Sequence, residues 1–171
     1  MRRAPHVVLI PLTEQQRAAF VEESLADHAD QQVRDAGWSR DEALDRVRAE
    51  LTGEFEREHV EAVRQGDRFW TAIDQSRGPV GWLWVKPYGS ASSKTAYLEQ
   101  ITVARASRRR GYGGAMLAAL EEALAHDGVE ELRLSVFLAN EAARRLYAAA
   151  DFESLGQDER VCRLRKVLAP N

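Results

Sequence analysis

The sequence lacks the features that would place it among membrane, disulfide-linked or metal-cage proteins. It has a single cysteine, Cys162, so neither an internal disulfide nor a cysteine-based metal cage can form. Its four histidines are scattered without the spacing of metal ligands, and we predict no metal site. No apolar run approaches the ~20 residues that a membrane-spanning helix needs, and the apolar stretch near the N-terminus is too short for a secretory signal. These absences predict a cytoplasmic protein without a membrane partner.

Positive charge is also in short supply for the molecule as a whole. The 24 lysines and arginines are outnumbered by 27 acidic residues, which gives a formal net charge of −3. The chain as a whole is therefore not built to condense on nucleic acid, and any basic patch must act locally. Its 171 residues, 44% of them hydrophobic, suffice for one globular core, and no low-complexity linker interrupts them. We predict a single domain over residues 1–171.

Hydrophobic periodicity divides the chain into strands and helices. Runs of β-type residues predict strands at 6–12, 68–73, 80–88, 95–103, 131–137 and 161–168. Helical spacing predicts helices at 13–36, 40–63, 111–126 and 140–150. Ser39 and Glu42 form a capping box at the start of the second helix, and Gly37 is expected to end the first. The order of elements indicates an α/β fold of the α+β type, with a mixed sheet covered by helices.

Arginines and glycines are concentrated in the stretch 103–117, just before a predicted helix. Glycine permits backbone N–H groups to line up around an anion, and the positive end of the helix dipole favours negative charge there. The stretch matches neither the phosphate-binding loop of ATPases nor the dinucleotide-binding fingerprint. Two other interpretations stay open: a solvated surface, or a nucleic-acid patch made by Arg105, Arg108, Arg109 and Arg110.

Two motifs in this order carry a family resemblance. Arg108-x-x-Gly111-x-Gly113 resembles the R/Q-x-x-G-x-G/A signature of the GNAT superfamily of N-acetyltransferases. The later stretch 140–152 is similar to that family's second motif, N-x-x-A-x-x-L-Y-x-x-x-G-F, at Asn140, Ala143, Leu146, Tyr147 and Phe152. The chain departs from the pattern with Arg105 where proline is frequent and with Asp151 where glycine is usual. Asp tolerates positive φ better than most residues, so we expect Asp151 to be accommodated.

The resemblance implies a mostly antiparallel central sheet of about seven strands, flanked by about four helices, with a splay between the fourth and fifth strands. It implies acetyl-coenzyme A as cofactor, with the pyrophosphate on the backbone of 109–114 and the pantetheine between 101–103 and 132–137. The residues that the resemblance assigns to coenzyme binding are Ile101, Thr102, Val103, Arg108, Arg109, Arg110, Gly111, Tyr112, Gly113, Gly114, Asn140, Ala143 and Tyr147.

The implied activity is acetyl transfer to the primary amine of a small molecule, peptide or protein, directly within a ternary complex. Tyr147 is the candidate acid, because a phenol with an ordinary pKa of ~10 holds its proton at pH 7 and can pass it to a thiolate. Glu99 is the candidate base, since strand alternation would put Tyr97, Glu99, Ile101 and Val103 on one face. The alternatives are a packing role for Tyr147 and a salt bridge for Glu99. The Val103 amide is expected, by resemblance, to polarise the thioester carbonyl.

The acceptor side is less determined by the sequence. On a helical wheel Glu22 lies near the apolar stripe of its helix, which predicts a buried carboxylate with an arginine partner or a bound cation. Trp38 and Trp84 are candidates for walls of the acceptor site, although the tryptophans also suit a core. An alternative function is a non-catalytic acyl-coenzyme A sensor with the same fold. Dimers are frequent in the family, so the resemblance leaves a homodimer open.

Overall fold

The chain forms two compact units in the computed structural model, which describes residues 5–90 and 92–169, with side chains undescribed at 31, 34–36 and 50–60. The helical unit is Leu12–Asp67, and the sheet unit consists of the segments on either side, Met1–Pro11 and Arg68–Asn171. That the two units make up one domain over residues 1–171 stays a prediction.

The helical unit consists of α1 (Glu14–Ala36) and α2 (Arg40–Arg64). The predicted capping signals are confirmed: Ser39 and Glu42 form a reciprocal capping box, and Gly37 ends α1 with a φ of 68°. Within the unit, α1 and α2 pack through a small apolar cluster of Leu25, Ala29, Ala43 and Val47. Of the helices in the described residues, none combines the length and the apolar character needed to cross a lipid bilayer.

The sheet unit has seven strands among its described residues, in the order β1-β2-β3-β4-β5-β7-β6. Only β4 and β5 run parallel, and the other five neighbouring pairs are antiparallel. The predicted mostly antiparallel sheet of about seven strands is therefore confirmed. The strands are β1 (Val8–Pro11), β2 (Arg68–Asp74), β3 (Gly78–Tyr88), β4 (Thr95–Val103), β5 (Glu131–Phe137), β6 (Glu153–Gln157) and β7 (Val161–Val167).

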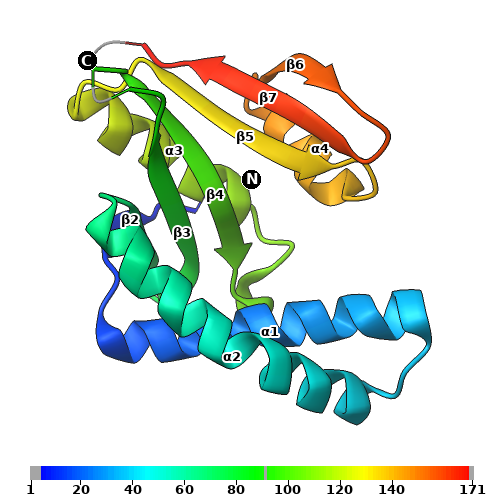
Figure 1. The fold of residues 1–171 in the computed structure, drawn as a ribbon. Coiled ribbons are helices and arrows are strands. Elements are labelled where there is room, and N and C mark those ends of the chain that lie inside the picture. Colours follow the sequence, from blue (N-terminus) through cyan, green and yellow to red (C-terminus); the bar gives the residue numbers. More distant parts are fainter. Residues whose placement is uncertain (1–4, 91, 170–171) are drawn as a thin grey trace. The chain divides into compact units, whose positions relative to one another are not determined.

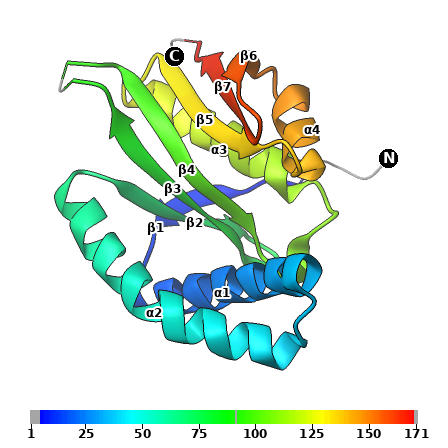
Figure 2. The same ribbon diagram turned by 45° about the vertical axis from the view of Figure 1, so that its right-hand side comes forward.

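Two helices cover one face of this sheet, which we call the core face. They are α3 (Tyr112–His126), which follows the short 3₁₀ turn η1 (Arg105–Ser107), and α4 (Glu141–Ala149). Figures 1 and 2 show both helices on the same side of β5 and β7. The core they bury contains Met116, Leu117 and Leu120 of α3 against Leu83, Val85 and Leu98 of the strands. We call the other side of the sheet the reverse face.

The strands β4 and β5 are paired at only one end. Their parallel register joins Thr95 to Glu131, Ala96 to Leu132 and Tyr97 to Arg133, and it stops there although β4 continues to Val103. Figure 1 shows the two strands side by side at this end and diverging beyond it. The predicted splay between the fourth and fifth strands is therefore confirmed, and we call the point after Tyr97 and Arg133 the fork.

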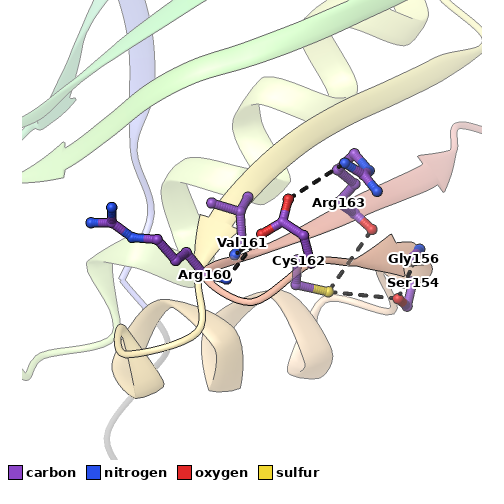
Figure 3. Close-up of polar contacts among 7 residues, drawn as sticks. Ser154, Gly156, Arg160, Val161, Cys162 and Arg163 are labelled. Atoms are coloured by element: carbon purple, nitrogen blue, oxygen red, sulfur yellow. Dashed lines mark hydrogen bonds and ion pairs between the residues drawn. The ribbon is translucent and has the colours of Figure 1, made fainter.

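Hydrophobic pattern did not reveal β6, the strand at the sheet edge. Its residues are mostly exposed, so it carries no alternation, and a bulge between Ser154 and Gly156 interrupts its register with β7. Cys162 lies on β7 as a buried strand residue, as its apolar alternation predicts. Its sulfur lies 3.6 Å from Ser154 Oγ on β6, and Figure 3 shows this contact between the two strands. β6 is therefore a strand because its backbone pairs with β7, and not because its side chains are buried.

Candidate functional site

The turn between β4 and α3 leaves a row of backbone N–H groups without partners among residues 5–90 and 92–169. The first helical amides, those of Tyr112, Gly113 and Gly114, have no preceding carbonyl within α3 to bond to, and the first bond back to the turn is from Ala115 N to Gly111 O. Gly111 has a φ of 85°, and no side chain caps the helix at this position. Among the described residues, the open amides thus await an acceptor that lies outside the chain, and the helix dipole favours an anionic one.

The three glycines of this turn are required for different reasons. Gly111 adopts a left-handed conformation that other residues rarely accept. A Cβ on Gly113 would lie 3.1 Å from Leu146 Cδ2, so this glycine allows α3 and α4 to approach closely. A Cβ on Gly114 would meet no protein atom within 4 Å. The fold therefore explains Gly111 and Gly113, whereas the space beside Gly114 is free for a ligand.

The three arginines of the turn differ in their contacts: Arg108 bonds to the main chain, whereas Arg109 and Arg110 are exposed. Arg108 Nε donates to the carbonyl of Val103 at 2.9 Å, which ties the turn to the end of β4. Arg109 has a φ of 61°, an uncommon conformation for a residue with a Cβ, and its side chain is exposed. Arg110 is also exposed. Arg109 and Arg110 can therefore contact an anion at the helix end, while Arg108 also has a structural duty.

Tyr112 anchors the start of α3 through its side chain. Its hydroxyl donates to Asp74 Oδ2 at 2.7 Å, at the end of β2. The hydroxyl and amide of Ser76 bond to the same carboxylate. Hydrogen bonds from Ser76 and then Tyr112 lower the pKa of Asp74 to about 2, and the pKa of Tyr112 is raised mainly by its bond to Asp74. A ligand can therefore use the backbone of Tyr112, while its ring and hydroxyl are engaged within the sheet unit.

Past the fork, β4 turns backbone groups away from β3. Ala104 N donates to Val80 O at 2.9 Å, and Thr102 lies opposite Trp82 in the same register. Hydrogen-bonded and non-hydrogen-bonded pairs alternate along an antiparallel ladder, so the N–H groups of Ile101 and Val103 point to the other side, where β5 has separated. The outward carbonyl of Val103 is the one that Arg108 takes up. An extended chain bearing amides could therefore hydrogen-bond along this side of β4.

A β-bulge at Glu99 corrects the predicted face of β4. Trp84 pairs with Gln100 but Val85 pairs with Leu98, so Glu99 is an extra residue. Ile101 lies opposite Leu83 on the core face, whereas Tyr97 lies opposite Lys86 on the reverse face. The expectation that Tyr97, Glu99, Ile101 and Val103 share one face is therefore wrong, because the bulge inverts the alternation.

Glu99 itself makes an ion pair with Lys86 on β3. Since Lys86 lies on the reverse face with Trp82 and Trp84, the Glu99 carboxylate lies there too. Its side chain is about a third exposed, at 33%. The salt bridge that is the alternative role for Glu99 is thus present in the structure. If Glu99 acts as a base, it does so while it is next to Lys86.

Tyr147 of α4 is buried in the core of the sheet unit. Its ring packs edge-on against Phe152 at 5.5 Å between centroids, and 6% of the residue is exposed. Burial raises the pKa of Tyr147 to about 12, and proximity to Tyr97 acts in the same direction. Within the described part of the chain its hydroxyl has no hydrogen-bond partner. The group is therefore a protonated donor that is available to a ligand.

Asn140 and Ala143 organise the start of α4. The Asn140 side chain accepts from Ala143 N at 3.1 Å, which makes Asn140 the N-cap of the helix, as sequence reasoning allowed. Ala143 packs against the core. At the other end of α4, Asp151 adopts a φ of 59°, so the expected accommodation of an aspartate in place of glycine is confirmed.

The predicted acceptor residues lie in both units. Glu22 pairs with Arg48 at 2.8 Å within the helical unit, so the expected arginine partner is present, but the carboxylate is 60% exposed rather than buried. Trp38 packs beside the small core of that unit, under the guanidinium of Arg46 at 4.4 Å. Trp84 stacks on Phe69 of the neighbouring strand β2, with centroids 5.1 Å apart. A role in acceptor binding stays a prediction for all three.

Sequence reasoning missed Lys86, Tyr88 and Arg133 as neighbours of the fork. Tyr88 stacks on Tyr97 with centroids 5.6 Å apart, and Lys86 lies 5.1 Å from the centroid of Tyr97 on β4. Arg133 lies over Tyr88 at 5.2 Å and joins β5 to the group. The clue was in the register of β3 against β4, which no single-strand pattern reveals. The cluster gathers charged and aromatic groups at the point where β4 and β5 part.

Comparison with known proteins gives one family for this arrangement. The model of the acetyltransferase (GNAT) family matches residues 28–152. The chain is similar to the N-acetyltransferase YdgE of Bacillus subtilis, with 26% identity over 92% of this chain and 95% of that protein. It is 36% identical to the aminoglycoside N(6')-acetyltransferase type 1 of Serratia marcescens and 31% identical to YycN of Bacillus subtilis. These two matches cover 47% and 49% of this chain, and 53% and 54% of those proteins. The chain thus spans about half the length of these two relatives.

Solved structures share the fold at low sequence identity. The PaiA N-acetyltransferase of Thermoplasma acidophilum, in complex with coenzyme A, superposes with a TM-score of 0.68 at 15% identity over 94% of this chain and 98% of that one. The spermidine N-acetyltransferase of Vibrio cholerae, in complex with coenzyme A and spermine, gives a TM-score of 0.68 at 15% identity, over 95% and 96% of the two chains.

Proposed function

We propose, on the premise that this chain belongs to the acetyltransferase (GNAT) family, that it transfers an acetyl group directly to a primary amine within a ternary complex. Membership makes it an acetyltransferase whose cofactor is acetyl-coenzyme A. When bound, that cofactor supplies the acetyl group as a reactive thioester.

The residues that would hold the cofactor fit its chemistry. The open amides of Tyr112, Gly113 and Gly114, with the exposed Arg109 and Arg110, suit a pyrophosphate. The outward N–H groups of Ile101 and Val103 suit an extended amide arm and a carbonyl that gains negative charge. The free space beside Gly114 supports this placement, because no protein atom fills it.

Tyr147 acts as the general acid from the core face. Its raised pKa keeps the hydroxyl protonated throughout the neutral range, so Tyr147 would donate a hydrogen bond to the leaving sulfur and hold the proton where negative charge develops. The state of this hydroxyl carries the proposal: it belongs to a residue that is only 6% exposed, it is protonated, and it has no partner among the described residues.

Glu99 accepts a proton from the amine on the reverse face. The acceptor nitrogen must lose a proton before it bonds to the acetyl carbon, and a carboxylate one-third exposed can take it directly or through water. Acid and base would then lie on opposite faces of the sheet, with the open side of β4 between them. That separation suits direct transfer, because the group that accepts the proton of the amine and the group that donates to the sulfur do not compete for the same place.

The acceptor is proposed to be a primary amine. Relatives and structural neighbours bear names that include an aminoglycoside and spermidine as acceptors. Those names support an amine in general rather than either compound for this chain.

Thiol release from acetyl-coenzyme A across a panel of primary amines tests the proposal. We expect amine-dependent release, and we expect Tyr147→Phe to lower kcat by about 100-fold or more while leaving the Kd of coenzyme A and the melting temperature nearly unchanged. Coenzyme binding without release by any amine would favour the alternative, a non-catalytic acyl-coenzyme A sensor. Unchanged turnover in Tyr147→Phe would overturn the assignment of the acid.

A further inference from the structure

A preformed ion pair lies beside the place where the amine must react. Lys86 and Glu99 are on neighbouring strands of the reverse face, with their side chains 39% and 33% exposed. Glu99 is two residues before Ile101, the first residue past the bulge whose N–H points outward. An incoming amine that uses Glu99 therefore meets the ammonium of Lys86 at the same time.

Lys86 is held in this position by the aromatic groups of the fork. Its ammonium lies 5.1 Å from the centroid of Tyr97, which stacks on Tyr88 at 5.6 Å. Arg133 closes the far side of Tyr88. Tyr97 thus contacts Lys86 and Tyr88, and Tyr88 also contacts Arg133. The cation–π contact with Tyr97 favours the present position of Lys86 even when Glu99 changes partner.

The charges of the pair select among amines. A second positive charge on the acceptor would be brought close to Lys86 and repelled by it, most strongly where solvent is partly excluded. A carboxylate near the reacting nitrogen would instead replace Glu99 as the partner of Lys86. The ammonium and carboxylate of such an acceptor would mirror the Lys86–Glu99 pair, so neither protein charge is left without a partner.

We propose that the acceptor is an amine that carries a carboxylate close to its nitrogen, as an amino acid does. Lys86 binds this carboxylate, while Glu99 accepts a proton from the amine. The inference rests on the proposed function, and it names the acceptor class for the same site. Lys86 is a specificity-determining residue in this scheme. It contacts the part of the acceptor that does not react.

Three amines with the same three-carbon chain test the inference. They are 3-aminopropanoate, propylamine and 1,3-diaminopropane, whose far ends are a carboxylate, a methyl group and an ammonium. We expect the highest kcat/KM with 3-aminopropanoate. Lys86→Met should lower the ratio of kcat/KM for 3-aminopropanoate to that for propylamine by about tenfold to 100-fold, as for the loss of a hydrogen bond to a charged group. Lys86→Glu should shift the preference toward the diamine.

Lys94→Met is the matched control, because Lys94 is likewise exposed and paired with one glutamate, Glu130, but lies outside the fork cluster. We expect it to leave all three amines unaffected. Calorimetric titration of the protein loaded with coenzyme A, which cannot turn over, gives a second measure: 3-aminopropanoate should bind most tightly, and Lys86→Met should abolish that preference.

The outcomes separate this inference from the proposed function. Release of thiol with the diamine or propylamine but not with 3-aminopropanoate would overturn the inference and leave the transferase intact. An equal loss for all three amines in Lys86→Met would also overturn it, because Lys86 would then act through Glu99 alone. No release with any amine would contradict the proposed function, and the inference with it.

Discussion

The two halves of β4 are parts of one strand with opposite duties. Before the bulge, Thr95–Leu98 pairs with β3 on one side and, up to Tyr97, with β5 on the other. After the bulge, 100–103 pairs with β3 alone, and its outward amides face the region that β5 has left. The first half completes the sheet, while the second offers its backbone to a ligand. A strand thus becomes a binding edge when its parallel neighbour stops pairing.

Truncation of Leu98, in the closed half, should have the largest effect on stability. Leu98 is 3% exposed within the main core, so Leu98→Ala should lower the free energy of unfolding by about 2–5 kcal/mol, through lost burial and a cavity. Ile101→Ala, in the open half, should cost less than half as much, because Ile101 is only partly buried. Denaturant titration measures both. Equal losses would mean that the two halves do not differ in packing.

Removing the outward N–H of Val103, in the open half of β4, should impair catalysis without impairing folding. Proline lacks the N–H and is tolerated in a strand where that group faces away from the ladder. We expect Val103→Pro to lower kcat/KM about 100- to 1,000-fold, as the loss of one oxyanion donor does, with a small change in melting temperature.

The adjacent residue provides the control for Val103→Pro. Ala104 N donates to Val80 O at 2.9 Å, so Ala104→Pro breaks the ladder to β3 and should lower the melting temperature markedly. If both proline variants unfolded equally, the assignment of outward and inward amides along β4 would be wrong.

Gly113 and Gly114 of the turn allow the same comparison between a residue needed for packing and a residue that faces the ligand, with smaller expected effects. Gly113→Ala would press on Leu146 and should cost about 1 kcal/mol or somewhat more of folding free energy. Gly114→Ala meets no protein atom, so it should stabilise the helix by up to about 1 kcal/mol. It should weaken coenzyme A binding by about tenfold, ~1.4 kcal/mol. Melting curves and calorimetry distinguish the two; unimpaired coenzyme binding by Gly114→Ala would contradict the ligand placement.

The pH dependence of turnover should show the smallest effect. The pKa of Tyr147 is raised from its ordinary value of 10.0 to about 12, so the acid stays protonated, and its contribution to stability is present below pH 10 and lost as the pH rises through 12. We therefore expect no alkaline loss of kcat caused by Tyr147 between pH 7 and 10. A fall in that range that disappears in Tyr147→Phe would contradict the raised pKa.

Sequence periodicity predicted most of the fold because local signals and tertiary structure agree. The β4 and β5 ranges were predicted residue for residue, since each is a β-rich run closed by turn residues. The coenzyme turn was recognisable because its glycines and arginines are adjacent in sequence. Asn140 could be read as a helix cap for the same reason: its signal is local.

Features that depend on pairing between segments could not be predicted. Beyond Glu99 the side chains of β4 change face because Glu99 has no partner in the register with β3. The sequence of β4 alone cannot reveal that one of its residues is bulged. The edge strand β6 is polar, so only its pairing to β7 makes it a strand. Glu22 lies near the apolar stripe on a helical wheel, but a long side chain at its margin reaches solvent and Arg48.

The bulge at Glu99 makes the length of β4 more critical than its composition. If Glu99 were instead paired in regular alternation, Ile101 and Val103 would point away from the core and Gln100 and Thr102 would point into it. Deleting Glu99 would leave those faces unchanged, because Val85–Leu98 and Trp84–Gln100 would become successive pairs of a regular ladder, whereas a deletion within 100–102 would invert the residues that follow it. Chimeras with other members of the family would therefore need a crossover that keeps this phase shift within one parent.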